Sequence, residues 1–237
     1  MVNKNAYGIV KSSIDYYQNN RNTIEELYES EKYFLKPLFN KVKTVLDIGT
    51  AAGGLSNICN EINPLLIYTG IDISPELISL AKKEYPNSHF EFYDGKIIPY
   101  TKSSFDLVFS LGVLHHLSHW KSIITQMLSI SKDYVVFDLR LTRKKTLNNP
   151  KKYYQKLTLN NIWDGKTKIA YIVLNVDEVY RFIKNLIKED YSCEVFGYSV
   201  VPNKSCGVRI PYNEVYSCSF YISKNKSKPV FIDHVCW

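Results

Sequence analysis

Short apolar runs alternate with helical stretches along the first part of the chain. Each run is five or six residues long, which fits a strand buried on both faces. We expect strands at TVLDI (44–48), LIYTGI (66–71), HFEFY (89–93), FDLVFS (105–110) and YVVFDL (134–139). Helices are expected between them, at 53–62, 75–84 and 120–130. Such β–α alternation predicts a parallel sheet with helices on both faces.

A helical pattern precedes the first strand. Thr23 and Glu26 have the spacing of a capping box, and apolar residues recur at helical intervals at Ile24, Leu27, Tyr28, Phe34, Leu35 and Leu38. We expect an amphipathic helix over 23–39 that ends near Lys36 and Pro37, because proline disrupts helical hydrogen bonding.

The pattern changes after Thr142. A basic segment rich in Asn and Tyr follows at 143–168, and we interpret it as an insertion over the edge of the sheet. A helix is expected at 177–188, and alternating residues at 192–200 and 215–223 predict a strand pair.

These patterns predict an α/β fold with a Rossmann-like, seven-stranded, mostly parallel sheet and helices on both faces. An N-terminal helical arm and a lid inserted after the fifth strand complete it. We expect one domain over 1–237, in four parts: the arm (1–43), the cofactor-binding core (44–142), the basic insertion and helix (143–190), and the strand pair and tail (191–237).

Composition is that of a folded protein, with 45% hydrophobic and 22% charged residues. No apolar run approaches the roughly 20 residues that span a bilayer, and the N-terminus lacks the apolar segment of a secretory signal, so we expect a cytoplasmic location. The five cysteines form no C-x-x-C pair and are odd in number, which favours reduced thiols. The net charge is +7, and residues 143–168 hold eight basic residues against one acid.

The segment VLDIGTAAGGLSNIC joins a strand to a helix through a loop of small residues. Small residues let the backbone approach a ligand, and the free N–H groups of the helix N-terminus favour a negative group. Asp72 follows 25 residues after Asp47, at the end of the second strand, where a carboxylate can accept both hydroxyls of a ribose. Asp94 follows the third strand, and FDLVFSLGVLHHL supplies the fourth strand and its loop.

In these four blocks, over about residues 42–140, the chain resembles the class I S-adenosylmethionine-dependent methyltransferase superfamily, particularly its small-molecule branch. An NAD-binding Rossmann protein is the main structural alternative, but the loop lacks a dinucleotide fingerprint. The resemblance implies S-adenosyl-L-methionine as the cofactor. It assigns the amino-acid part to Asp47, Gly49, Thr50, Ala51 and Gly53, the ribose to Asp72, the adenine to Ile73, Asp94 and Gly95, and the methionine portion to Ser110 and Leu111.

Ala51 departs from the superfamily pattern, which has glycine in the middle of this loop. The backbone at Ala51 must therefore take a negative φ or accept strain.

The candidate catalytic residues follow the fourth and fifth strands. His115 is the candidate general base, and Asp138 would orient it or the substrate, an arrangement that resembles methyltransferases of sugar hydroxyls. His116 is expected to be structural. Methyl transfer needs mainly the alignment of a nucleophile and the exclusion of water.

For the acceptor we expect a polar or anionic small molecule, such as a sugar or nucleotide-linked intermediate, methylated on oxygen rather than nitrogen. Arg140 and Arg143 are candidates for gripping its anion, since guanidinium binds phosphate or carboxylate bidentately, and Tyr16 is a further candidate. Methylation of RNA or protein through the basic segment 143–168, and a regulatory protein that binds the cofactor without turnover, remain alternatives. No metal is implied, and oligomeric state stays open.

Overall fold

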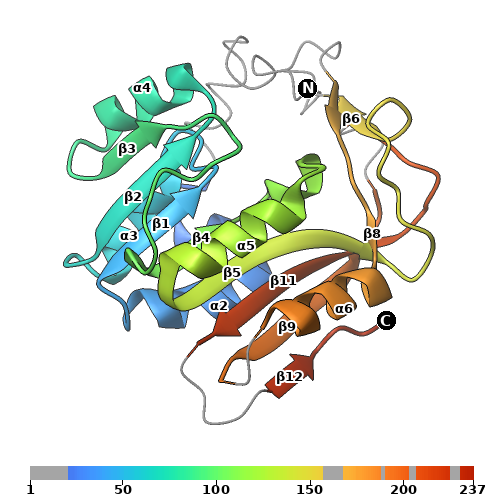
Figure 1. Ribbon diagram of the computed structural model, residues 1–237. Coiled ribbons are helices and arrows are strands. Elements are labelled where there is room, and N and C mark those ends of the chain that lie inside the picture. The colour runs from blue at the N-terminus through green and yellow to red at the C-terminus, as the bar shows by residue number, and fades with distance from the viewer. Residues whose placement is uncertain (1–20, 157–167, 188–189, 203–206, 225–229) are drawn as a thin grey trace.

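A nine-stranded sheet forms the centre of the described structure (Figure 1). The computed structural model describes residues 21–156, 168–187, 190–202, 207–224 and 230–237. The strands of this sheet are β1 (Thr44–Ile48), β2 (Ile67–Asp72), β3 (His89–Phe92), β4 (Phe105–Ser110), β5 (Ser131–Thr142), β8 (Leu174–Asn175), β9 (Ser192–Val200), β11 (Val215–Ser223) and β12 (Val230–Asp233). Their order is β12-β9-β11-β5-β4-β1-β2-β3, with β8 paired to the end of β5.

Most neighbouring strands are parallel, as predicted, and β11 is the exception because it runs antiparallel to both β5 and β9. All seven predicted strands lie in this sheet. The predicted number is nevertheless too low for the described chain, since β8 and β12 also join. Both are short, and β12 is largely exposed, so neither carries the apolar signal of a buried strand. The fifth predicted strand grows to twelve residues because β11 pairs with residues 134–141, β4 extends the start at Ser131, and β8 extends the end at Thr142.

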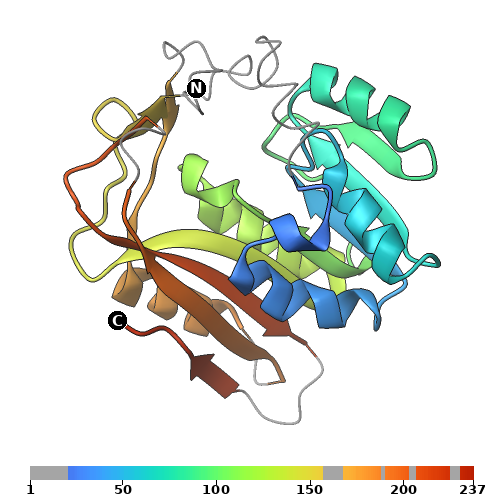
Figure 2. The same ribbon diagram turned by 180° about the vertical axis from the view of Figure 1, so that it is seen from behind.

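Helices cover both faces. Figure 1 shows α5 (Trp120–Ile130) and α6 (Val176–Leu186) in front of the sheet. Figure 2, the view from behind, shows α2 (Glu29–Phe39) and α3 (Gly54–Ile62) on the opposite face. Helix α4 (Pro75–Glu84) belongs to the same core as α2 and α3. Because strand side chains alternate between faces, Leu46 packs with the α5 core and Val45 with the α2 core.

Local signals account for several helix boundaries. The Oγ of Ser74 accepts a hydrogen bond from the backbone N of Leu77 at the start of α4, and Pro75 occupies the first turn. The Asn175 side chain accepts from the backbone N of Asp177 and of Glu178 at the start of α6. These are the side-chain caps that satisfy the free N–H groups of a helix start.

The expected single helix over 23–39 is wrong in two respects. The chain first forms a short 3-10 turn, η1 (Ile24–Glu26), and becomes extended at Leu27 and Tyr28 before α2 begins. The break is stabilised by the Glu31 carboxylate, which accepts from the backbone N of Tyr28 at 3.0 Å. Helix α2 also continues past Pro37 to Phe39, since Leu38 and Phe39 are buried against the sheet.

A second, three-stranded antiparallel sheet, in the order β10-β6-β7, stands beyond the end of β5 (Figure 1). Its strands are β6 (Tyr154–Lys156), β7 (Lys168–Ala170) and β10 (Val208–Arg209). Residues 143–156 and 168–175 of the predicted lid are described here, whereas residues 157–167 lie outside the described residues. The backbone N of Ile172 donates to the carbonyl of His115, so this region is joined to the turn η2 (Leu114–His116) after β4.

Within the described residues, Cys59, Cys193, Cys218 and Cys236 are free thiols. No helix in the described part of the chain has the length and apolarity that crossing a bilayer requires.

Candidate active site

The loop between β1 and α3 has three residues with a left-handed backbone. Gly49 and Gly53 have φ of 88° and 85°, and Ala51 has φ of 51°. Of the two conformations that the sequence left open at Ala51, the chain takes the strained one, which costs an L-residue roughly 1–2 kcal/mol. In this conformation the backbone N of Ala51 donates to Asp72 at 3.0 Å, and this hydrogen bond holds the loop against the end of β2.

Asp72 is fixed by backbone donors on both sides. One carboxylate oxygen accepts from Ala51 N, and the other accepts from Ser74 N at 2.9 Å. Burial raises the pKa of Asp72, while these backbone hydrogen bonds oppose the rise. Each carboxylate oxygen has a second lone-pair direction, so the pair can still accept two ligand hydroxyls.

Asp47 supports the loop from inside the core. It is 1% exposed, and it accepts a 2.5 Å hydrogen bond from the hydroxyl of Tyr68, which lies 2.8 Å from the Thr50 hydroxyl. Burial raises the pKa of Asp47 to about 7. Gly70 leaves the room that Thr50 fills, since a Cβ at Gly70 would lie 2.5 Å from the Thr50 oxygen. The side chains of Asp47 and Thr50 therefore bond to Tyr68.

The residues assigned to adenine lie together where β2 and β3 end. Ile73 is partly buried, and a Cβ at Gly95, which has φ of 78°, would lie 3.0 Å from it. Asp94 is exposed two residues beyond β3 and accepts from the backbone N of Lys96 at 2.8 Å. The Gly95 carbonyl lies 2.9 Å from Nε2 of His119. The end of β3 therefore forms a fixed turn beside Ile73.

The side chains of Ser110 and Leu111 are buried in the core and do not line the site expected for the methionine portion. Ser110 is fully buried, and its hydroxyl donates to the carbonyl of Ile48 at 2.9 Å. Leu111 is 6% exposed and packs in the α2 core. Only the backbone of Ser110 and Leu111 is therefore available to the site. The next residue, Gly112, has a left-handed backbone with φ of 72°.

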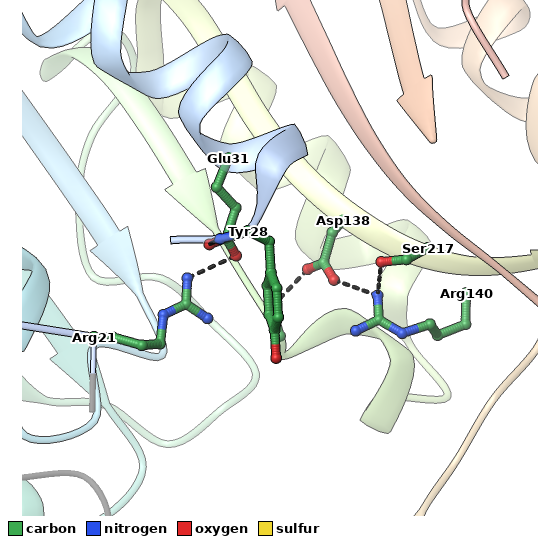
Figure 3. Close-up of polar contacts among 7 residues, drawn as sticks. Arg21, Tyr28, Glu31, Asp138, Arg140 and Ser217 are labelled. Atoms are coloured by element: carbon green, nitrogen blue, oxygen red, sulfur yellow. Dashed lines mark hydrogen bonds and ion pairs between the residues drawn. The ribbon is translucent and has the colours of Figure 1, made fainter. Parts of the chain in front are cut away.

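An ion pair joins Asp138 to Arg140 on β5 (Figure 3). Nη1 of Arg140 lies 2.6 Å from Asp138 and 3.0 Å from the hydroxyl of Ser217 on β11. The other oxygen of Asp138 accepts from Gly112 N at 2.6 Å. Burial alone would lower the pKa of Arg140, but the Asp138 carboxylate reverses this and raises it. These contacts of Asp138 go to Gly112 and Arg140, and not to His115.

His115 lies beside this ion pair. It is 5% exposed, its ring is 3.9 Å from the ring of His116 and 5.4 Å from that of Tyr171, and its Nδ1 is buried with no hydrogen-bond partner among the described residues. Burial, with contributions from His116 and Arg140, lowers the pKa of His115 well below its usual value. The imidazole is therefore neutral at physiological pH.

His116 is tied to the second sheet. Its Nδ1 lies 2.6 Å from the carbonyl of Ala170 on β7, and burial lowers its pKa to about 4. This contact agrees with the structural role expected from the sequence.

The two arginines expected to grip an acceptor are on different sides of the sheet. Arg140 pairs in register with Ser217, whereas Arg143 lies 5.8 Å over Trp237, which packs on Tyr216. Ser217 and Tyr216 are consecutive in β11 and point to opposite faces. Arg140 and Arg143 therefore do not converge on one anion. Tyr16 lies outside the described residues.

Sequence reasoning missed the residues that reach the site from the segment before β1. Figure 3 shows Arg21, Tyr28 and Glu31 next to Asp138 and Arg140. Nη2 of Arg21 lies 2.6 Å from Glu31, which is 3% exposed. A signal was present, since position 31 lies at helical spacing from Leu35 and Leu38 on the apolar stripe of α2, and a charge there needs a buried partner.

The described residues contain no group of three or more His, Cys, Asp and Glu side chains placed to hold a metal ion.

Comparison with known proteins identifies a family to which the sequence is similar. The family described as "Methyltransferase domain" matches residues 39–191, more than half of the chain. The demethylmenaquinone methyltransferase of Chlorobaculum parvum is 38% identical over 66 residues, which is 27% of this chain and 26% of that protein. A phthiotriol/phenolphthiotriol dimycocerosates methyltransferase of Mycobacterium leprae is 26% identical over 91 residues, 37% of this chain and 33% of that protein. The matched segments thus span about a quarter to a third of these relatives.

Among solved structures, the O-methyltransferase of a trans-AT PKS multienzyme from Brevibacillus brevis, solved with S-adenosyl-L-homocysteine, superposes with a TM-score of 0.57. The sequences are 12% identical, and the match covers 87% of this chain and 82% of that one. At this identity the likeness concerns the fold.

Proposed function

The chain belongs to the methyltransferase domain family, and on that premise we propose that it transfers a methyl group from S-adenosyl-L-methionine to an oxygen atom of a polar, anionic small molecule such as a sugar or nucleotide-linked intermediate. Membership confirms the predicted superfamily and S-adenosyl-L-methionine as its cofactor. The observation that carries the acceptor proposal is the Arg140 guanidinium, which Asp138 and Ser217 hold at the carboxyl edge of the sheet.

The residues at the ends of β1 and β2 fit the cofactor. Asp72 has both oxygens oriented by backbone N–H groups, which suits the two hydroxyls of a ribose. The turn formed by Asp94 and Gly95 lies beside Ile73, which follows Asp72 directly, so adenine can lie next to the ribose. Asp47 and Thr50 act through Tyr68 by setting the shape of the loop, and the loop backbone from Gly49 to Gly53 is the part that approaches the ligand.

Arg140 suits an anionic acceptor. An arginine is charged at all physiological pH values, and the Asp138 carboxylate raises the pKa of Arg140 further. Hydrogen bonds to Asp138 and Ser217 use Nη1 and fix the plane of the guanidinium. The side chain is 14% exposed, so part of it still faces solvent. A fixed guanidinium binds phosphate or carboxylate with little loss of side-chain entropy.

His115 is the group proposed to receive the acceptor's proton. When bound, S-adenosyl-L-methionine supplies a methyl group on a sulfonium sulfur, which leaves as a neutral thioether. A hydroxyl acceptor must lose its proton as its oxygen bonds to that methyl group, so it needs a nearby base. His115 is neutral, and its buried Nδ1 has no partner among the described residues. Burial keeps the basicity of His115 low, so the proton would be held only transiently.

The alternatives make different predictions. An RNA or protein methyltransferase would use the basic segment 143–168, where Arg143, Lys144, Lys145, Lys151, Lys152 and Lys168 are exposed. Binding through phosphate contacts would weaken steeply with salt. A regulatory protein would bind the cofactor and transfer no methyl group to any acceptor.

The test is transfer of a labelled methyl group to a panel of acceptors that contains sugar phosphates, nucleotide-sugars, hydroxylated carboxylates, their neutral counterparts, RNA and protein. We expect labelling of an anionic acceptor. For that acceptor Arg140→Lys, which keeps the charge but loses the planar fork, should raise KM about tenfold, the equivalent of one charged hydrogen bond. Arg143→Lys is the matched control and should leave KM unchanged. Labelling of neutral acceptors alone, or of RNA or protein alone, would contradict the proposal.

A further inference from the structure

Arg21 lies across the carboxyl ends of β1 and β4, outside the residues matched to the family. Nη2 bonds to Glu31, and Nη1 is 3.9 Å from the position of a Cβ on Gly112, where it is the nearest described atom. The charge of Arg21 also acts on Asp47 and Asp138, the acids at the ends of β1 and β5. The guanidinium is therefore placed between the loop after β1 and the loop after β4.

The backbone at Arg21 is held in a costly conformation. Its φ is 65°, a left-handed value that an L-residue with a long side chain rarely adopts. The next residue secures it, because the Asn22 carbonyl accepts from Asn57 on α3 and the Asn22 side chain accepts from the Tyr85 hydroxyl. Backbone strain of this kind persists where surrounding contacts impose it, and it is concentrated at functional sites.

The guanidinium is also incompletely paired. Nε of Arg21 is buried and has no hydrogen-bond partner among the described residues, and Nη2 donates to one carboxylate oxygen of Glu31 at 2.6 Å. A buried donor without a partner lowers stability, and the cost is larger for a charged group. The side chain as a whole is 28% exposed, and its Nη1 is the guanidinium nitrogen that lies toward Gly112.

From this geometry we propose that Arg21 binds the carboxylate of the cofactor's amino-acid group, so that the segment before β1 completes the cofactor site. The inference rests on the proposed function, and it adds a residue that the resemblance does not assign. A carboxylate matches the guanidinium in shape and charge. The arginines Arg21 and Arg140 balance the carboxylates Glu31 and Asp138, and a zwitterionic amino-acid group would leave this balance unchanged.

The test compares two ligands that differ in that carboxylate alone. S-Adenosylmethionine and its decarboxylated form are titrated calorimetrically into the wild type and into Arg21→Gln. We expect the wild type to bind S-adenosylmethionine about ten- to a hundredfold more tightly than the decarboxylated form, the range of one or two charged hydrogen bonds. Arg21→Gln should abolish the preference and leave affinity for the decarboxylated form within about threefold.

Several outcomes separate this inference from the proposed function. Equal wild-type affinity for the two ligands, or an equal loss of both in Arg21→Gln, would overturn the role of Arg21. If the wild type binds neither ligand, the proposed function itself fails. Because Arg21→Gln leaves Glu31 buried without its partner, Arg21→Lys is titrated as well, and it should show a reduced but measurable preference. Arg143→Gln is the matched control and should keep the full preference.

Discussion

The side chain of Ala51, a single methyl group, affects the conformation of the cofactor-binding loop after β1. Ala51 occupies a left-handed backbone position between two glycines that adopt the same region without penalty. Its backbone N is one of the two donors that orient Asp72, so the strained conformation is maintained by a contact to the cofactor-binding carboxylate. A glycine at this position would keep the contact and relieve the strain.

Ala51→Gly is therefore expected to stabilise the fold. Relief of the left-handed conformation, reduced by the greater chain entropy of glycine in the unfolded state, should leave a gain of about 0.5–1 kcal/mol in the free energy of unfolding. Urea denaturation measures it. Ala52→Gly is the matched control, since Ala52 is buried and is not among the residues with positive φ, and that substitution should destabilise the protein. Equal losses in both variants would contradict the account.

Asp47 is a buried acid whose titration should be visible in the stability of the whole fold. Its pKa is raised from 3.8 to about 7, chiefly by burial. Between these values the folded state binds a proton that the unfolded state does not, so the Asp47 contribution to stability falls as pH rises through this window, by at most about 1.4 kcal/mol per pH unit. Above pH 7 the contribution becomes constant.

Asp47→Asn removes this titration while keeping an acceptor for the Tyr68 hydroxyl. Its stability relative to the wild type should rise from pH 5 to pH 7 and then level off, as measured by urea denaturation at each pH. Asp106 has a lowered pKa and serves as the control, because Asp106→Asn should give a difference from the wild type that stays flat over the same range. A flat difference for Asp47→Asn would show that Asp47 is ionised in the fold.

At the scale of elements, the turn before α2 is joined to the start of α3. Gly54 opens α3, and a Cβ there would lie 2.3 Å from the Asn22 side-chain oxygen and 2.6 Å from the Arg21 carbonyl. A backbone carbonyl cannot yield as a flexible side chain can. The absence of a side chain at Gly54 is therefore what lets residues 21–23 contact the helix, and through them Arg21 reaches the site.

Gly54→Ala should displace this segment without unfolding α3, because alanine has the higher helix propensity. The expected result is faster tryptic cleavage after Arg21, by about tenfold, with the far-UV circular dichroism unchanged. Cleavage after Lys102, which is exposed, provides an internal reference in the same digest and should keep its rate. An unchanged rate after Arg21 would mean that the contact at Gly54 does not hold the segment.

At the scale of the whole molecule, the sequence predicts best the buried strands and helices that alternate along the chain. The parallel strands and their helices follow from apolar runs such as FDLVFS, and the positions of Gly49, Asp72 and Gly95 follow from strand ends. Contacts between distant segments carry no comparable signal. The hydrogen bond from the backbone N of Gly112 to Asp138, and the approach of Arg21 to the site, depend on how the elements pack.

The short and irregular parts were also beyond prediction. Strands β8 and β12 are two and four residues long and gain their pairing only from neighbours already in place. The break at Leu27 and Tyr28 depends on the Glu31 cap, which is itself fixed by a partly buried ion pair with Arg21. In each case tertiary contacts overrode the local pattern.

The most direct test of the central claim is calorimetric titration of the purified protein with S-adenosylmethionine and with NAD, repeated on Asp72→Ala. We expect the wild type to bind S-adenosylmethionine and not NAD, and Asp72→Ala to lose at least about tenfold in affinity because the ribose hydroxyls lose their acceptor. Binding of NAD in place of S-adenosylmethionine, or wild-type affinity for S-adenosylmethionine in a folded Asp72→Ala variant, would contradict that claim.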